Sequence, residues 1–225
     1  LLNVNFVAAD ATGQSLLHQV RFHQRRGDEV RVFVMHPPEG IPADISRLTR
    51  VVDGIDLIGR QDEFFQNCDL YVYHYPGHYD LLDSIKTLER GAVIFYYQNV
   101  TPPELWGSES GRAELVEGQA AVAKFANRSD LIVTDSAYNA DELVNNYGVS
   151  REHIRVMPLA APMDRFKPGP ADLDLIRRYN LAGKEVLLYV GRVAGNKRVD
   201  LLVEALAKVK RERPNALLLV VGDNN

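Results

Sequence analysis

Cysteine, long apolar runs and blocks of like charge are what this sequence has least of, and each shortage excludes a class of protein. Cys68 is the single cysteine, which excludes an internal disulfide and a cysteine-rich metal site. No apolar run approaches the roughly 18 residues that a membrane span needs. The net charge is −4, and neither sign forms a long run, so a nucleic-acid groove is not indicated. We therefore expect a cytoplasmic protein that binds no nucleic acid.

What the sequence does contain is an alternation of strand and helix patterns. A hydrophobic content of 46% over 225 residues is enough to bury a full core. The alternation predicts an α/β fold with a doubly wound parallel sheet. We expect strands near 4–8, 30–35, 70–74, 92–97, 131–134 and 154–156, and helices over 15–26, 79–90, 103–126 and 138–147.

A change in amino-acid composition divides the chain into two parts. Prolines and a glycine crowd the stretch "PMDRFKPGP" at 162–170, which is typical of an inter-domain connection. We expect a first domain over 1–165 and a second beginning at 166–225, with a helix near 172–179, a strand at 186–190, a helix after Lys197 and a strand at 216–221. Two strands and two helices cannot cover both faces of a parallel sheet, so we expect this second domain to be incomplete in the chain.

The stretch "YVGRVAGNKRVDLL" at 189–202 carries the strongest chemical signal. The apolar run before it predicts a strand buried on both faces, and Gly191 permits a sharp turn into the next helix. The first amides of such a helix favour a negative ligand, and Arg192 and Lys197 stand beside them. Phosphate is the natural candidate. The alternative is that both cations are ordinary solvated loop residues.

Polar residues also follow the expected strands of the first domain, at the edge where open α/β sheets bind ligands. Asp10 and Gly13 follow the first strand, Gln98 and Asn99 the fourth, and Ser136 the fifth. Thr12, Ser15 and Ser136 can also be interpreted as helix caps. Gln98 and Asn99 have no evident capping role. The acidic "DLD" at 172–174 is interpreted as a helix start, and "HYPGH" at 74–78 is broken by Pro and Gly, which argues against zinc binding.

Several of these stretches resemble one known family. They are "DATGQSLLHQV", "YVYHYPG", "YYQNVTPPELW", "TDSAYNADEL", "YVGRVAGNKRVDLLVEAL" and "PNALLLVVGDN", and they are similar to the retaining glycosyltransferases of family 4, also called group 1. The resemblance implies the GT-B fold, in which two Rossmann-like domains hold the acceptor and the nucleotide-sugar donor. It implies that Arg192 and Lys197 grip the donor diphosphate, with Gly191 and Gly222 beside them. The acceptor-side cleft would contain Asp10, Gly13, Gln98, Asn99, Thr101 and Ser136.

The implied activity is transfer of a sugar from a nucleotide-diphosphate donor with retention at the anomeric carbon. Charge released onto the phosphate would be met by Arg192 and Lys197, so no metal or other cofactor is obligatory. Gln98 stands where related enzymes commonly have His and cannot carry a proton, which leaves the donor sugar open. The resemblance also implies a pair of glutamates, spaced E-x7-E, that contacts the donor sugar and ribose and would lie beyond Asn225. We therefore expect the chain to be part of a longer enzyme and inactive alone.

Some identities stay open at this point. The acceptor would be a sugar, a lipid or a polysaccharide. Peripheral association with the inner face of a membrane and the oligomeric state are undecided. Two other functions are also compatible with the residues. One is a nucleotide-sugar epimerase of the same fold, and the other is a non-catalytic module that binds a sugar or a nucleotide.

Overall fold

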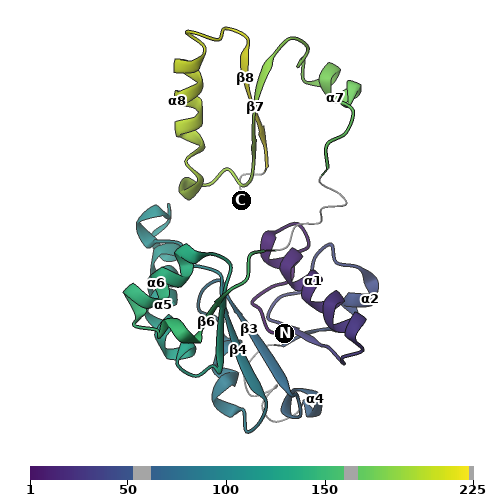
Figure 1. Cartoon of the computed structure of the whole chain (residues 1–225), viewed down its shortest axis with the longest axis vertical. Helices are drawn as coiled ribbons and strands as arrows, with labels where there is room; N and C mark the ends of the chain where they lie inside the picture. The colour runs from purple at the N-terminus through teal and green to yellow at the C-terminus, as the bar shows by residue number, and fades with distance from the viewer. Residues whose placement is uncertain (53–61, 160–166, 223–225) are drawn as a thin grey trace. The chain divides into compact units, whose positions relative to one another are not determined.

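The computed structural model of the chain describes residues 1–52, 62–159 and 167–222 (Figure 1). The chain divides into two compact units. Unit 1 comprises Leu1–Val100 and Ala113–Ala161, and unit 2 comprises Thr101–Arg112 and Pro162–Asn225. The expected α/β fold built on parallel sheets is confirmed. The domain boundary predicted at 165–166 lies outside the described residues.

Unit 1 alternates strands and helices along the chain. Its strands are β1 (Val32–Val34), β2 (Thr49–Val51), β3 (Leu70–Tyr75), β4 (Ala92–Tyr97), β5 (Leu131–Thr134) and β6 (Ile154–Val156). Its α-helices are α1 (Ala11–Arg26), α2 (Ala43–Ser46), α4 (Glu63–Gln66), α6 (Ala137–Tyr147) and most of α5 (Glu109–Ala126). The 3-10 helices η1 (Asp80–Thr87) and η3 (Arg151–His153) complete the described set.

The strands of unit 1 form a parallel sheet whose order reverses near its middle. The amino-terminal segment lies between β1 and β3, because Leu2 N donates to Val72 O at 2.9 Å and Asn3 N donates to Phe33 O at 3.1 Å. The spatial order is therefore β2, β1, the first residues of the chain, β3, β4, β5 and β6. In such sheets the point of reversal is where ligands bind. The strand expected at 4–8 is displaced toward the start of the chain, since Leu2 makes the bridges to both neighbours.

Helices cover both faces of this sheet. Figure 1 shows α1 on one side and α5 with α6 on the other. On the α1 side, Gln19 contacts His74. On the α5 side, Tyr75 donates to Gly118 O at 2.6 Å and packs near Phe125. The core is rich in aromatic side chains, among them Tyr71, Tyr73, Tyr75, Phe95 and Tyr97.

Two helices differ from their predictions for local reasons. The segment expected as a helix over 79–90 is the 3-10 helix η1, in which Ser84 and Thr87 hydroxyls donate to carbonyls three residues earlier. Such bonds compete with α-helical pairing. The helix expected over 103–126 is split into η2 (Pro103–Leu105) and α5. Ser108 Oγ accepts from Gly111 N at 3.2 Å, which starts α5 anew.

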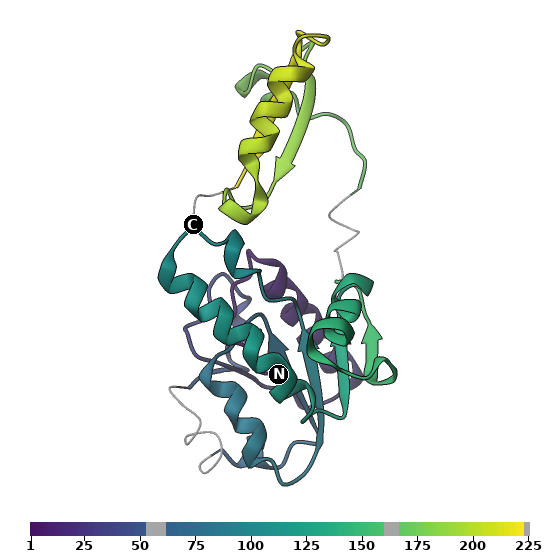
Figure 2. The same cartoon turned by 90° about the vertical axis from the view of Figure 1, so that its left-hand side faces the viewer.

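Unit 2 contains a shorter alternation. The helix α7 (Leu173–Arg178) is followed by β7 (Glu185–Val190), η4 (Gly195–Lys197), α8 (Val199–Val209) and β8 (Ala216–Val221). The acidic residue Asp172 caps α7 as the sequence indicated, since its Oδ1 accepts from Asp174 N and Leu175 N. Strands β7 and β8 are parallel and in register, and α8 runs alongside them (Figure 2).

The prediction that β7 is buried on both faces is wrong for the described residues. Leu187, Leu188 and Val190 are 46%, 62% and 70% exposed. A pair of strands with one neighbouring helix covers a single face of the sheet, and apolar side chains on the other face stay open.

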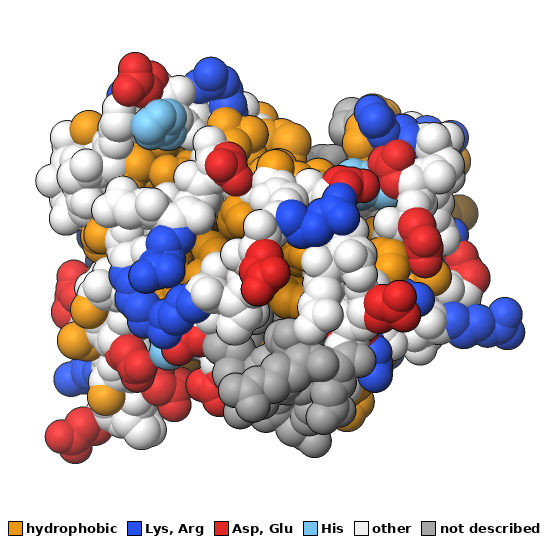
Figure 3. Space-filling view, turned by 90° about the horizontal axis from the view of Figure 1, so that it is seen from below, with side chains coloured by type: hydrophobic (Ala, Val, Ile, Leu, Met, Phe, Trp, Pro, Cys, Tyr) orange, Lys and Arg blue, Asp and Glu red, His pale blue; other side chains and the backbone are white. Residues whose placement is uncertain are grey.

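Charged residues at the surface of unit 1 are mixed in sign. Figure 3 views the end of unit 1 that carries α4, and acidic and basic side chains alternate there with hydrophobic ones between them. Within the described ranges, no helix is long and apolar enough to span a membrane.

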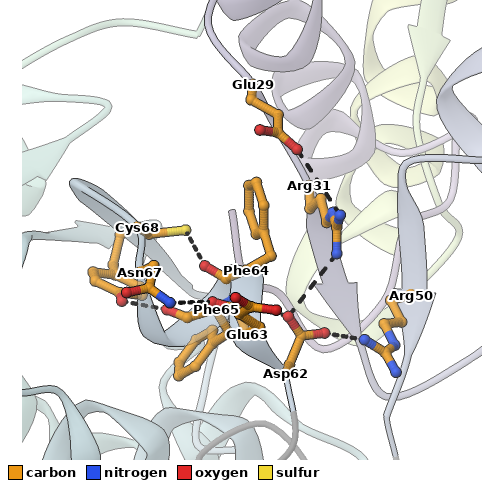
Figure 4. A network of polar contacts seen from close by, with 10 residues as sticks. Glu29, Arg31, Arg50, Asp62, Glu63, Phe64, Phe65, Asn67 and Cys68 are labelled. Atoms are coloured by element: carbon orange, nitrogen blue, oxygen red, sulfur yellow. Dashed lines mark hydrogen bonds and ion pairs between the residues drawn. The ribbon is translucent and has the colours of Figure 1, made fainter.

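One buried carboxylate joins three segments of unit 1 (Figure 4). Asp62 is 4% exposed, pairs with Arg50, and lies 4.0 Å from the Arg31 guanidinium. Its Oδ1 also accepts from Phe65 N at 2.9 Å, which caps α4. Arg31 in turn stacks over the ring of Phe64, 4.3 Å from its centre. The carboxylate therefore fixes α4 against the strands β1 and β2.

Candidate active site

The residues predicted after β4 and β5 lie along one edge of the unit 1 sheet. In the strand register, Tyr75 is beside Tyr97, and Tyr97 is beside Thr134. Because these strands are parallel, the residues that follow them leave the sheet at the same edge. Gln98, Asn99 and Ser136 are therefore brought to one edge. Thr101 follows two residues after Asn99 and is half-buried, and it is grouped with unit 2.

Asp10 and Gly13 build the turn that starts α1. Asp10 Oδ1 accepts from Gly13 N at 2.5 Å, so Asp10 is the cap, in place of Thr12 or Ser15. The reason is that α1 begins at Ala11, four residues before the predicted start at 15. A Cβ on Gly13 would lie 1.7 Å from Val7 O, so only glycine permits this close packing. Asp10 and Gly13 thus have a structural role in addition to their predicted role in the acceptor-side cleft.

A polar cluster around one buried histidine lies under this edge on the α1 side. Its members are Gln19, His74 and Gln98. Gln19 Oε1 is 3.2 Å from His74 Nε2, and Gln19 Nε2 donates to Ser15 Oγ at 3.1 Å. Since Gln19 Oε1 can only accept, the His74 proton sits on Nε2. His74 Nδ1 and Gln98 Oε1 are both buried, and the Gln98 side chain is a polar neighbour of the His74 imidazole.

The environment of His74 keeps its imidazole neutral. The side chain is fully buried between Gln19 and the ring of Tyr96, whose centre lies 5.0 Å away. Burial lowers the pKa of His74 to about 3. A neutral imidazole here is a hydrogen-bonding group of the core and not a general acid near neutral pH.

The His74 pKa predicts a specific dependence of stability on pH. Below pH 6.5 the unfolded chain protonates this histidine, while the folded chain does so only near pH 3. Protonation therefore favours the unfolded state, and the free energy of unfolding falls by about 2 kcal/mol between pH 7 and pH 5 through this group. Urea denaturation at several pH values measures it.

The matched variants for this prediction are His74→Gln and His36→Gln. We expect His74→Gln to flatten the pH dependence, whereas His36 is exposed and its replacement serves as the control. Equal slopes for wild type and His74→Gln would contradict the assignment.

Ser136 and Asn99 differ from each other in their local roles. Ser136 Oγ accepts from Asn139 N at 3.2 Å and caps α6, as the sequence anticipated. Asn99 has a φ of 72°, in the left-handed region, and its side chain donates to Asn139 and Glu142. Asn139 and Glu142 are site-forming residues that the sequence reasoning missed. Their spacing of three places them on one face of α6 behind the cap, which is the signal that was available.

In unit 2 the strands β7 and β8 end in apposed glycines. Gly191 N donates to Val221 O at 2.9 Å. A Cβ on Gly222 would lie 1.9 Å from Gly191 O, and Gly222 has a φ of 154°. Glycine at position 222 therefore lets the two strand ends come close together.

The cations at 192, 197 and 198 are not equivalent. Arg198 forms an ion pair with Asp200 at 2.9 Å, which raises the pKa of Arg198. Among the residues that the structure describes, Arg192 and Lys197 have no ion-pair partner, and both are exposed. The first turn of α8 has no side-chain cap, since Arg198 at the N-cap makes no capping bond. The uncapped amides of α8 and the unpaired cations Arg192 and Lys197 therefore both follow the turn at Gly191.

The next question is whether the chain offers a site for a metal ion. Over the described ranges, no three His, Cys, Asp or Glu side chains come close enough together to hold a metal ion.

Two family models match the chain. The model described as Glycosyltransferase Family 4 matches residues 12–165, and the model described as Glycosyl transferases group 1 matches residues 174–225. The first match alone covers more than half of the chain.

Two individual proteins that resemble the chain are consistent with these family models. The chain is 30% identical over 161 residues, 65% of its length, to a D-inositol 3-phosphate glycosyltransferase from Nocardia farcinica, and it covers 36% of that protein. It is 35% identical over 99 residues, 43% of its length, to mannosylfructose-phosphate synthase from Agrobacterium fabrum, covering 22% of it. The chain thus spans less than half the length of these relatives.

A solved structure shares the fold. HepE from Anabaena, in complex with UDP-glucose, matches with a TM-score of 0.65 and 16% identity, over 94% of this chain and 57% of that one. This likeness shows the fold. The two family models confirm the expected family: the chain belongs to the glycosyltransferases of family 4, group 1.

Proposed function

We propose that the protein containing this chain transfers a sugar from a nucleotide-diphosphate donor to an acceptor hydroxyl, with retention at the anomeric carbon. The observation that carries the proposal is the turn after β7. There the apposed Gly191 and Gly222, the unpaired Arg192 and Lys197 and the uncapped first turn of α8 occur together. These are the groups that a diphosphate needs.

The chemistry follows from where charge develops. As the bond between sugar and phosphate breaks, negative charge grows on the leaving diphosphate, and groups already in place lower the barrier. Arg192 offers a planar fork that matches two phosphate oxygens, and Lys197 adds a compact charge. With these cations present, no metal is obligatory. Retention requires attack from the face that the leaving group departs from, so the leaving phosphate itself would accept the acceptor proton.

The acceptor is proposed to bind at the edge of the unit 1 sheet. Gln98 brings a side-chain amide there, and Asp10, Gly13, Asn99, Thr101 and Ser136 belong to the same proposed cleft. The proteins that resemble this chain support a phosphorylated polyol or sugar as acceptor, because their names include an inositol 3-phosphate glycosyltransferase and a mannosylfructose-phosphate synthase. The UDP-glucose complex of HepE supports a nucleotide-sugar as donor.

A donor panel tests the proposal. The full-length protein is incubated with UDP-, GDP- and ADP-sugars, with and without inositol phosphate and hexose phosphate acceptors, and the anomeric configuration of any product is determined by NMR. We expect transfer with retention from one class of donor. An epimerised donor formed without an acceptor would identify an epimerase, and binding without any turnover would identify a non-catalytic module.

A further inference from the structure

Asn99 has a left-handed backbone conformation, which asparagine tolerates better than most other non-glycine residues do. Its φ is 72°, whereas non-glycine residues with positive φ are uncommon and are retained only where the surroundings hold them. Asn99 directly follows Gln98, whose backbone N donates to Tyr75 O at 3.2 Å and whose side-chain Oε1 is buried. The left-handed turn therefore sets the direction in which the chain leaves β4 at the proposed acceptor edge.

Two side chains of α6 hold Asn99 in this conformation. Asn99 Nδ2 lies 3.0 Å from Asn139 Oδ1 and 3.0 Å from Glu142 Oε2. Asn139 is 6% exposed, and its own Nδ2 donates to Asp135 Oδ1 at 2.6 Å, so its oxygen must face Asn99. A carboxylate only accepts. Both partners thus require the NH₂ group of Asn99, which fixes its rotamer.

Glu142 also binds the last residue of β4. The Tyr97 hydroxyl donates to Glu142 Oε2 at 2.8 Å, and Tyr97 is fully buried. One carboxylate oxygen therefore joins the end of the strand to the turn that follows it. Hydrogen bonds to a charged acceptor are stronger than neutral ones, so this joint is well suited to hold the left-handed turn.

We propose that Glu142 and Asn139 are positioning residues for sugar transfer: through Asn99 they hold the turn after β4 in the left-handed conformation, and this turn fixes the position of Gln98 at the proposed acceptor edge. The inference rests on the proposed function, in which Gln98 belongs to the acceptor cleft. Glu142 and Asn139 themselves need no contact with substrate.

Kinetics of the full-length protein test the proposal. We expect Asn99→Ala to lower kcat by about 10- to 100-fold, the scale of a misplacement of roughly 1 Å. Asn99→Gly should recover part of the thermal stability that Asn99→Ala loses, because glycine adopts the left-handed turn without strain. Glu142→Ala should resemble Asn99→Ala, and Glu142→Gln should stay within about threefold of wild type, since its amide oxygen can still accept both bonds.

Asn180 supplies the matched control. Its φ is 53°, it is exposed after α7, and it lies outside the network. Asn180→Ala introduces the same kind of backbone strain, so we expect it to lower thermal stability as Asn99→Ala does while leaving kcat within about twofold of wild type. Equal kcat values for Asn99→Ala and Asn180→Ala would overturn the positioning role.

The two levels of hypothesis fail in different ways. If wild type transfers sugar and Arg192→Ala loses activity while Asn99→Ala keeps it, the positioning role alone is wrong. If Asn99→Ala loses activity while Arg192→Ala keeps it, the diphosphate clamp alone is wrong. If wild type transfers no sugar from any donor of the panel, both are wrong. Crystal structures of wild type and Asn99→Ala give the φ at position 99 directly, and a right-handed residue 99 in wild type would also overturn the inference.

Discussion

Turnover of the full-length protein should fall by two to three orders of magnitude when either Arg192 or Lys197 is replaced by Ala. Removing one preorganised group that stabilises developing charge costs about 10²- to 10³-fold in kcat. Both side chains are exposed, and neither has an ion-pair partner among the described residues, so folding should hardly change. Steady-state kinetics with the best donor of the panel, together with thermal unfolding of each variant, measure the two effects separately.

The chain offers two controls for this experiment. Lys208→Ala removes an exposed cation from the last turn of the same helix, α8, and should leave turnover within about twofold, because a helix terminus acts only over its own turn. Arg198→Ala tests the neighbouring cation that Asp200 already pairs, and we expect a smaller effect than at Arg192. Turnover of both Arg192→Ala and Lys197→Ala within a few-fold of wild type would show that these side chains only face solvent.

Asp62→Ala should strongly destabilise unit 1. The substitution removes the cap of α4 and the acceptor of the Arg50 and Arg31 guanidinium groups from a site that is 4% exposed. A lost cap costs about 1 kcal/mol, and a lost hydrogen bond to a charged group costs about 1.5–3 kcal/mol. Both arginines reach solvent, so their own desolvation adds little. We expect the free energy of unfolding to fall by about 3 kcal/mol, measured by urea denaturation followed by circular dichroism.

Asp69→Ala is the matched control for that variant. Asp69 also pairs with an arginine, Arg90, at 2.9 Å, but its side chain is 94% exposed. Exposed pairs contribute little, so we expect a change below about 0.5 kcal/mol. If the two variants lose the same stability, the Asp62 network does not hold α4 against the strands.

Local patterns in the sequence predicted much of the fold because they act over a few residues. Strands β4, β5, β6 and β8 have the predicted bounds. Gly27 and Gly148 close their helices in the left-handed conformation, as C-terminal glycines commonly do. The short strand β2 and the helices α2 and α4 were missed, because segments of three or four residues are too short to show a period.

The candidate site also has one part that the sequence predicted and one part that it did not. The glycine turn with Arg192 and Lys197 is contiguous in sequence, so a strand, a glycine and a helix pattern were enough to indicate it. The structural roles of Asp10 and Asn99 could not be predicted from the sequence. Asp10 became the cap because α1 starts earlier than its apolar pattern does, and Asn99 owes its partners to a helix that lies some 40 residues away in sequence.

What the sequence determined by itself is the order of strands and helices, the family, and the cations beside the turn after β7, because propensity, hydrophobic period and short motifs are local properties. The tertiary structure alone decided that the first residues lie between β1 and β3, that His74 is buried and neutral, and that Glu142 reaches both Tyr97 and Asn99. Strand order, desolvation and hydrogen bonds between distant segments arise only when the chain packs, since each depends on which surfaces meet.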